Sequence, residues 1–247
     1  MESITLSEKL KEQLNTFLTY NEKEPDIVIS VGGDGTMLYS VHKYIDAIDR
    51  VAFIGIHTGT LGFLTDYQRD EYLQLVLDIQ NGQHRIYERH LLEVSCLEGT
   101  YFALNEVRIE NNRRSQVMDV YINDEYFETF RGNGLCVSTP VGSTAYNKSL
   151  GGAVINTCTG LMQLSEIAGI HHNAYRSLGS SLILDQSHTI RFQSQSYQGA
   201  ILGVDHLVID LKDKDCICVK MSSKKARFLQ YRNVSFTQRL KRAYLNS

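Results

Sequence analysis

The hydrophobic positions follow two different spacings along the chain. Up to about residue 85, short apolar runs alternate with segments in which apolar residues recur every three or four positions. The first spacing indicates buried parallel strands and the second indicates amphipathic helices. The predicted strands are 27–31 and 51–56, and the predicted helices are 6–18 with Ser7 in the first turn, 36–48, and 71–79 closed near Gly82.

After about residue 88 the spacing changes to alternation. Leu92, Val94 and Cys96 alternate with polar residues, as expected of strands with one buried face. Comparable short runs occur at 101–109, 117–122, 126–131, 134–139, 181–184, 188–193, 200–209 and 216–220. Asn123-Asp124, between two of these runs, is typical of a hairpin turn. We predict an all-β sandwich that is interrupted by a helical segment at about 144–170.

These spacings predict an α/β domain with a parallel sheet and a separate β-sandwich domain. The α/β domain comprises residues 1–86 together with 225–247, because Phe236, Leu240 and Tyr244 are spaced by four and predict a short helix that returns to it. The β-sandwich comprises residues 87–224.

The segment DIVISVGGDGT, residues 26–36, carries the first candidate chemistry. Its apolar run stops at Gly32, Gly33, Asp34 and Gly35, and Thr36 can start a helix. The glycines permit backbone angles that a Cβ would forbid, and the helix start offers free N–H groups to an anion. A carboxylate beside bound phosphates must bind a metal or accept a proton from a hydroxyl nucleophile, so the segment indicates phosphoryl transfer. The alternative is that Asp34 only caps the helix and the glycines only turn the chain.

Composition excludes several classes of protein. The 247 residues are 43% apolar and 21% charged, as in ordinary globular domains. No apolar run approaches the ~20 residues of a membrane span, and the first residues do not resemble a signal peptide, so we expect a cytoplasmic protein. The five cysteines are odd in number and mostly lie in strand-like runs, which favours buried free thiols over disulfides.

The charge is unevenly distributed. The formal net charge is −3, yet residues 220–247 hold eight Lys or Arg and no acid. No module for reading nucleic acid accompanies this basic segment. A solvated face, or a surface that helps to hold a polyanionic ligand, is the better interpretation.

A second unusual segment, RGNGLCVSTPVGSTAYNKSLGG at 131–152, offers backbone amides and small hydroxyls suited to a nucleotide. At this point the sequence resembles the NAD kinase family. The matching pieces occur in family order: GGDGT at 32–36, GIHTGTLGFL at 55–64, Asn105-Glu106, the segment just quoted, and VDH at 204–206.

The resemblance implies transfer of a phosphoryl group from ATP, or from polyphosphate in some members, to the 2′-hydroxyl of the adenosine ribose of NAD. It further implies a divalent metal cofactor such as Mg²⁺, a Rossmann-like N-terminal domain with a C-terminal β-sandwich, and a homodimer or homotetramer. It implies neither a nucleic-acid nor a membrane partner.

The family pattern also implies roles for individual residues. Asp34 corresponds to the residue that activates the 2′-hydroxyl, and Tyr175 to one that reaches the site of a neighbouring subunit. The predicted phosphate-binding or donor-binding residues are Gly32, Gly33, Gly35, Thr36, His57 and Arg131. The predicted NAD-binding residues are Gly33, Gly35, Phe63, Asn105, Glu106, Asn133, Thr144, Ala145, Tyr146, Ser149, Tyr175, Asp205 and His206.

Purely structural readings remain open for four of these residues. Glu106 could be an exposed strand carboxylate, Phe63 a core side chain, Tyr175 a surface tyrosine and His206 a structural histidine. Asn105 and Glu106 nevertheless have the hydrogen-bonding groups that an adenine edge and a ribose diol require.

The chain departs from the family pattern at three places. Asn133 stands where the family usually has aspartate, His57 stands where asparagine is commoner, and the N-terminal region is shorter than the family's usual first strand. The short N-terminal region and Asn133 leave open a non-catalytic regulator that binds NAD or NADP. A lipid or sugar kinase that shares GGDGT is a third hypothesis.

Overall fold

The computed structural model describes residues 2–59, 62–173, 175–213 and 215–245. The chain divides into two compact units, one formed by residues 1–88 and 225–247 and the other by residues 89–224.

The first unit is built on parallel strands. β1 (Ile27–Val31), β3 (Tyr67–Gln68) and the C-terminal end of β15 (Cys216–Gln230) all pair with β2 (Ala52–His57), and all three pairings are parallel. β2 is buried over five of its six residues, which is why its sequence is a continuous apolar run rather than an alternating one. The strands predicted at 27–31 and 51–56 are therefore confirmed.

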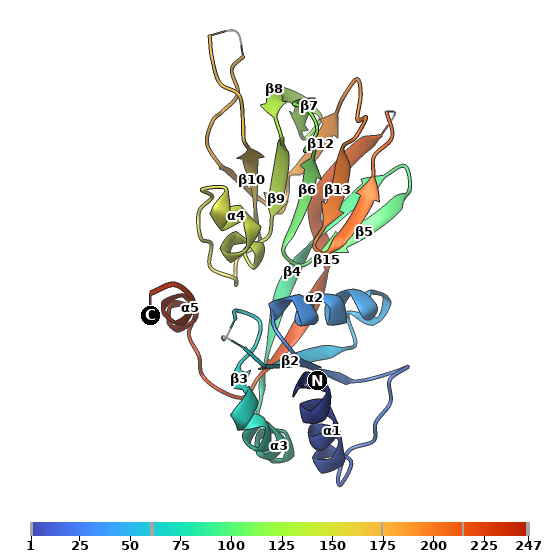
Figure 1. Cartoon of the computed structure of the whole chain (residues 1–247), viewed down its shortest axis with the longest axis vertical. Helices are drawn as coiled ribbons and strands as arrows, with labels where there is room; N and C mark the ends of the chain where they lie inside the picture. The colour runs from blue at the N-terminus through green and yellow to red at the C-terminus, as the bar shows by residue number, and fades with distance from the viewer. Residues whose placement is uncertain (1, 60–61, 174, 214, 246–247) are drawn as a thin grey trace. The chain divides into compact units, whose positions relative to one another are not determined.

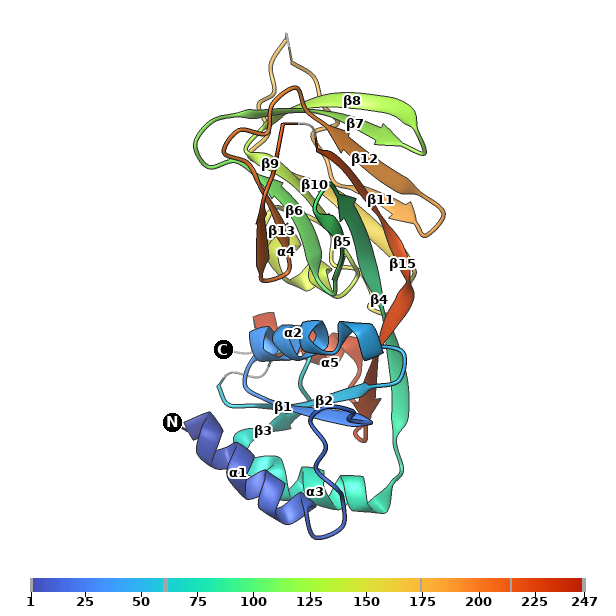
Figure 2. The ribbon, with the colours of Figure 1, turned by 90° about the vertical axis from the view of Figure 1, so that its right-hand side faces the viewer.

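Helices cover both faces of this sheet. Figure 2 shows α1 (Glu2–Leu14) and α3 (Tyr72–Asn81) on one face and α2 (Asp34–Lys43) on the other. Two short 3-10 turns lie between these elements, η1 (Ile45–Ala47) and η2 (Arg69–Glu71). After β15, the C-terminal segment forms the short helix α5 (Phe236–Leu240), which runs into a π-helical turn, η4 (Lys241–Leu245). Leu6 and Leu10 of α1 pack with Leu75 and Ile79 of α3 and with Ile54 of β2.

Several helix boundaries differ from the prediction, and α2 begins at Asp34 rather than at Thr36. α1 ends at Leu14, so Leu18 lies outside it and is exposed, and Ser7 is in the middle of the helix. α2 ends at Lys43, five residues before the predicted end. The C-terminal cap of α3 is as expected, because Gly82 adopts φ of 68°, a left-handed conformation that glycine accepts without strain.

The second unit consists of two sheets. In one, β15 is followed in order by β12 (Thr189–Gln193), β7 (Gln116–Ile122) and β8 (Glu125–Gly132), while β4 (Arg85–Cys96) pairs with β15 and β5 (Gly99–Ala103) (Figure 1). The other sheet has the order β11 (Leu182–Asp185), β10 (Leu161–Ile167), β9 (Gly134–Ser138), β6 (Glu106–Glu110), β13 (Ile201–Val204) and β14 (Leu207–Asp210). The two sheets enclose one apolar core, which includes Phe130, Phe192 and Val137.

The hairpin predicted at Asn123-Asp124 is confirmed. Both residues have positive φ, 50° and 65°, which is the backbone of the two-residue turns that match the twist of paired strands. All five cysteines are free thiols, although only Cys136 is buried.

Three predictions for this unit were wrong. The predicted helix at 144–170 is limited to a 3-10 turn, η3 (Gly142–Thr144), and one short helix, α4 (Tyr146–Ser149); residues 161–167 are strand β10. The runs at 101–109 and 200–209 are each two strands. Their breaks, at Leu104-Asn105 and Asp205-His206, coincide with candidate site residues.

Candidate functional site

The glycine turn after β1 presents free backbone amides. The amide of Gly32 donates to the Ile56 carbonyl (2.9 Å), and the amides of Thr36 and Met37 donate to the Gly33 carbonyl (3.0 and 3.2 Å). The amides of residues 33–35 lie between these and have no backbone acceptor within the described part of the chain. Free amides at the start of a helix favour an anion.

The reason for the glycines differs from the predicted one. Positive φ is found at five glycines, and Gly32, Gly33 and Gly35 are not among them. A Cβ on Gly32 would lie 2.2 Å from the Thr36 hydroxyl oxygen, whereas a Cβ on Gly35 would meet no protein atom within 4 Å. Close packing therefore requires Gly32, whereas no neighbour among the described residues requires Gly35.

Asp34 is the first residue of α2, and its carboxylate is held from another part of the chain. Its Oδ2 accepts from the Phe63 amide (2.8 Å) and its Oδ1 from the Leu64 amide (3.0 Å). The N-cap of α2 is Gly33, and no side chain caps the helix. The helix-capping alternative for Asp34 is therefore wrong. Each carboxylate oxygen keeps a lone pair that can accept from a hydroxyl.

Gly62 is a site residue that the sequence did not single out. A Cβ at this position would lie 2.3 Å from Asp34 Oδ1. The glycine thus lets the loop approach Asp34 closely enough for the next two amides to reach the carboxylate. The signal was present as the last glycine of GTLG, of which residues 60 and 61 lie outside the described residues.

His57, at the end of β2, borders the same turn. Its Nδ1 accepts from the Gly59 amide (2.9 Å), so the neutral ring carries its hydrogen on Nε2. A Cβ on Gly33 would lie 3.4 Å from that Nε2. In this tautomer the ring offers its Nε2 hydrogen as a donor next to the turn.

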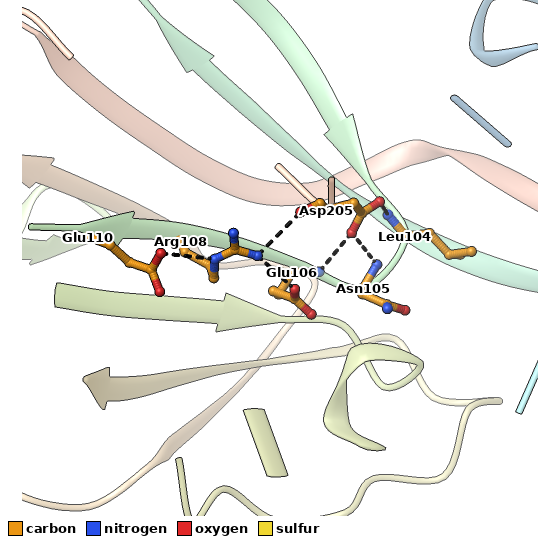
Figure 3. Close-up of polar contacts among 6 residues, drawn as sticks. All are labelled: Leu104, Asn105, Glu106, Arg108, Glu110 and Asp205. Atoms are coloured by element: carbon orange, nitrogen blue, oxygen red, sulfur yellow. Dashed lines mark hydrogen bonds and ion pairs between the residues drawn. The ribbon is translucent and has the colours of Figure 1, made fainter. Parts of the chain in front are cut away.

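In the second unit, Asp205 organises the backbone at the start of β6. Its carboxylate accepts from the amides of Leu104 (2.7 Å), Asn105 (2.8 Å) and Glu106 (3.1 Å) (Figure 3). Asp205 itself has φ of 52°, which aspartate tolerates better than most residues. Its side chain is committed to the protein backbone, whereas His206, next in the turn, is exposed.

The Asn105 carbonyl is fixed from the opposite strand. It accepts from the Thr139 amide (2.8 Å), and the Thr139 hydroxyl donates to the Leu104 carbonyl (2.6 Å). A Cβ on Gly142 would lie 2.0 Å from the Asn105 oxygen. With its backbone held on both sides, Asn105 can present its side-chain amide to a ligand at little entropic cost.

Glu106 belongs to a buried charged cluster on β6. Its Oε1 accepts from Arg108 Nη1 (3.2 Å), and Arg108 Nε pairs with Glu110 Oε2 (3.3 Å) (Figure 3). The second oxygen, Oε2, is buried without a hydrogen-bond partner among the described residues. Burial, and secondarily the charge of Asp205, raise the pKa of Glu106 to about 7, although Arg108 opposes the shift. The exposed-strand reading of Glu106 is therefore wrong.

The sequence did not single out Arg108 as a candidate site residue. It also gave no reason why the neighbouring position 203 must be glycine. A Cβ on Gly203 would lie 2.8 Å from Arg108 Nη2, so the glycine gives the guanidinium room. Arg108 also lies 5.5 Å from the centre of the Tyr146 ring. Burial, followed by the hydrogen bond to Glu110, raises the pKa of Tyr146 to about 12.

The structure thus brings the segment after β9 to the Asn105-Glu106 turn. Gly142 contacts Asn105, and Tyr146 contacts the charged cluster. Thr144 is buried, Ala145 is half-buried, and Ser149 is exposed on α4. The place of these small side chains in a nucleotide pocket stays a prediction.

Arg131 and Tyr175 pair with each other. The guanidinium carbon lies 4.2 Å from the centre of the Tyr175 ring, a cation–π contact. Tyr175 is 38% exposed and its ring lies 4.4 Å from that of His172. Arg131 therefore has an aromatic partner in its own unit.

Asn133 has a structural role that aspartate could not fill. Its Nδ2 donates to the Asn111 carbonyl (3.2 Å), while its own carbonyl accepts from the Asn111 amide (2.8 Å). A carboxylate has no hydrogen to donate and would face the carbonyl oxygen instead. In this chain asparagine is the residue that completes the contact between the end of β8 and the end of β6.

We expect Asn133→Asp to lower the free energy of unfolding by about 1–2 kcal/mol, because it removes a hydrogen bond and sets two acceptors against each other. Urea denaturation at neutral pH measures the change. Asn112→Asp is the matched control, because this substitution introduces the same charge nearby at an exposed position. Equal stability of the two variants would contradict the assigned contact.

The described residues contain neither a membrane-spanning helix nor a cluster of side chains that could hold a metal ion. Within the described ranges, no helix is both long and apolar enough to cross a membrane. No group of three or more His, Cys, Asp or Glu side chains arranged for a metal ion occurs in the part of the chain that the structure describes.

Both halves of the chain match known protein families. Residues 2–84 match the family described as ATP-NAD kinase N-terminal domain, and residues 104–231 match the ATP-NAD kinase C-terminal domain. NAD kinase 1 of Bacillus cereus is 41% identical over 98% of this chain and 94% of its own length. NAD kinase 1 of Bacillus subtilis is 42% identical over the same shares of the two chains.

Solved structures agree on the fold. Yeast NADH kinase complexed with NADH superposes with a TM-score of 0.78 at 22% identity, over 88% of this chain and 66% of the yeast chain. An NAD kinase from Archaeoglobus fulgidus in complex with ATP gives a TM-score of 0.74, also at 22% identity, over 96% and 90%. With two matching domain models and relatives above 40% identity over nearly the whole length, this chain belongs to the NAD kinase family.

Proposed function

We propose that this chain transfers a phosphoryl group from ATP to the 2′-hydroxyl of the adenosine ribose of NAD and so forms NADP. The observation that carries the proposal is the environment of Asp34. A carboxylate fixed by two loop amides stands at the start of a helix beside the amides of residues 33–35, which have no backbone acceptor among the described residues. That combination supplies a proton acceptor and an anion site in the same place.

The chemistry requires positioning more than covalent catalysis. Asp34 orients the ribose hydroxyl and accepts its proton as the 2′-oxygen bonds to the γ-phosphorus of ATP, while the bond from that phosphorus to the leaving ADP breaks. The amides of residues 33–35 and the Nε2 hydrogen of His57 donate to phosphate oxygens. Asn105 recognises the adenine edge, and the unpartnered Glu106 Oε2 accepts a hydrogen bond from a ribose hydroxyl of the dinucleotide.

The proposed reaction also involves a divalent metal ion, and the enzyme is proposed to assemble as an oligomer. A divalent cation such as Mg²⁺, when bound, neutralises charge on the donor phosphates. Because the described residues form no cage of protein ligands, the ion would be held mainly by those phosphates, as is usual for Mg²⁺. We place the enzyme in the cytoplasm as a homodimer or homotetramer, in which Tyr175 contacts the site of a neighbouring subunit.

The direct test is to incubate the purified chain with NAD, ATP and Mg²⁺ and to quantify NADP by chromatography. We expect ATP-dependent formation of NADP, and a parallel reaction with polyphosphate tests the second donor. NAD binding without any NADP formation would overturn the proposal in favour of a non-catalytic regulator. Phosphorylation of a lipid or free sugar in preference to NAD would favour the third hypothesis.

We expect Gly62→Ala to lower kcat at least about tenfold, since its Cβ would lie 2.3 Å from Asp34 Oδ1 and must displace either the loop or the carboxylate. Steady-state rates at saturating NAD and ATP, together with the thermal midpoint, measure the effect. A variant with the wild-type kcat would show that the close approach of this loop to Asp34 is not needed.

A further inference from the structure

The C-terminal segment contacts the loop that holds Asp34. The sequence SFTQ at 235–238 forms a capping box, in which the Gln238 amide donates to the Ser235 hydroxyl (3.2 Å) and Gln238 Oε1 accepts from the Ser235 amide (2.8 Å). Such a box fixes where a helix begins. It therefore fixes the position of Arg239 within the first turn of α5.

Arg239 binds the loop through three groups. Its Nη1 donates to the carbonyls of Phe63 (3.1 Å) and Thr65 (3.4 Å), and its Nη2 forms an ion pair with Asp66. The side chains of Arg239 and Asp66 are only 15% and 9% exposed. Such a sheltered pair, with bonds to two further carbonyls, is much more constraining than an exposed salt bridge.

One peptide group joins Arg239 to Asp34. The Phe63 carbonyl accepts from Arg239, and the N–H of the same peptide group, which belongs to Leu64, donates to Asp34 Oδ1 (3.0 Å). A peptide group is planar, so its carbonyl and N–H cannot turn independently. A cation at the carbonyl oxygen also polarises the peptide and strengthens its N–H as a donor.

The same terminal segment makes a second contact near the site. The Tyr244 ring lies 5.6 Å from the ring of Phe63. Burial and the charge of Asp34 both raise the pKa of Tyr244, which places the phenol within electrostatic reach of that carboxylate. Phe63 is thus held by the C-terminal segment at its carbonyl and at its ring.

We propose that Arg239 is a positioning residue for Asp34, acting through the peptide group between Phe63 and Leu64. The guanidinium fixes the orientation of that peptide and so aims the Asp34 carboxylate. The inference rests on the proposed function of Asp34 and assigns part of its precision to a residue near the other end of the chain.

The test is a double-mutant cycle on kcat for NADP formation. It compares the wild type, Asp34→Asn, Arg239→Ala and the double variant at saturating NAD and ATP. We expect Arg239→Ala to lower kcat about 10-fold to 100-fold in the wild-type background while KM for NAD changes less than about threefold. In the Asp34→Asn background, the same substitution should change the residual kcat by less than about twofold.

Arg232→Ala is the matched control. Arg232 also ties the C-terminal segment to the rest of the first unit, through Glu71 (2.6 Å) and the Tyr67 ring. Its described contacts do not include Phe63 or Leu64. We expect it to lower stability and leave kcat within about twofold. Hydrogen exchange of the 62–66 segment should become faster in Arg239→Ala and remain unchanged in Arg232→Ala.

Equal fold-losses from Arg239→Ala in both backgrounds, or a loss equal to that of Arg232→Ala, would overturn the inference. Arg239→Lys serves if the alanine variant does not fold, because one ammonium cannot bond two carbonyls and a carboxylate in the geometry of a guanidinium. Arg239→Lys should lower kcat by a smaller factor than Arg239→Ala, and this loss should likewise depend on the presence of Asp34. If Asp34→Asn alone leaves kcat unchanged, the proposed function fails first, and the two failures are distinguishable.

Discussion

Asp34→Asn is expected to lower kcat for NADP formation by about 10²–10⁴-fold, the usual contribution of a positioned general base. Two effects combine. The amide cannot take the proton of the ribose hydroxyl, and only one of its two terminal atoms can accept a hydrogen bond. The other would place an N–H against the amide of Phe63 or Leu64, both of which donate to the carboxylate in the native protein.

The measurement is the initial rate of NADP formation, paired with the dissociation constant for NAD from calorimetry. NAD affinity should change by less than about threefold, because the predicted contacts of the adenosine lie with Asn105 and Glu106. Asp46→Asn, an exposed acid just after α2, controls for the loss of one negative charge. A wild-type kcat in Asp34→Asn would remove Asp34 from the mechanism.

Glu106→Gln is expected to have opposite effects on stability and on binding. The Glu106 side chain is 7% exposed, one oxygen has no partner among the described residues, and burial raises its pKa to about 7. An acid with a pKa of about 4.3 in the unfolded chain then binds protons more tightly when folded. Its contribution to stability is full below about pH 4.3 and is lost as the pH rises through about 7.

The size of the effect follows from that shift. Each unit of pKa corresponds to about 1.4 kcal/mol, so a shift from about 4.3 to about 7 means that ionised Glu106 costs the folded state up to about 4 kcal/mol at pH 8. Glutamine removes the ionisation and still accepts from Arg108 with its carbonyl oxygen. We therefore expect a gain of about 1–3 kcal/mol in unfolding free energy at pH 8 and no gain at pH 4.3.

Binding should move the other way. At pH 8 the glutamine side chain presents an N–H where the carboxylate offered an acceptor to the ribose, so NAD affinity should fall about 10-fold to 100-fold. Guanidinium denaturation and calorimetry at the two pH values measure both effects. Glu110→Gln, which alters the other carboxylate paired with Arg108, should lower stability at both pH values.

Either of two results would contradict this account of Glu106. The first is a loss of stability at pH 8 in Glu106→Gln. The second is a gain of the same size at pH 4.3 and pH 8, which would mean that ionisation of Glu106 is not the cause. The side chain faces Asp205, Arg108, Glu110 and Cys136, and Tyr146 lies against the same cluster, so these groups must remain unchanged in the comparison.

The two groups of candidate residues, one in each unit, differ in what the sequence reveals about them. The turn around Asp34 is contiguous, and its strand, glycines and helix start could all be read from eleven residues. The Asn105-Glu106 turn depends on Asp205, whose carboxylate bonds to amides about a hundred positions earlier in the chain. The sequence grouped Asp205 with the ligand-binding residues, whereas the structure commits its carboxylate to the backbone of that turn.

The sequence by itself determined the local features of this protein: the parallel strands 27–31 and 51–56, the Asn123-Asp124 hairpin, the Gly82 cap and the family to which the chain belongs. These depend on side-chain spacing and on conformations set within a few residues. Only the tertiary structure decided that Asp34 is held by the Phe63 and Leu64 amides rather than capping a helix.

The tertiary structure also decided why particular residues are required. Gly32 and Gly62 are glycines because Thr36 and Asp34 occupy the space of a Cβ, and Asn133 must donate to Asn111. Arg239 reaches the loop of Phe63 across 176 residues of sequence. Such contacts depend on which surfaces pack together after folding. No periodicity or short motif along the chain indicates that residues so far apart in sequence will meet.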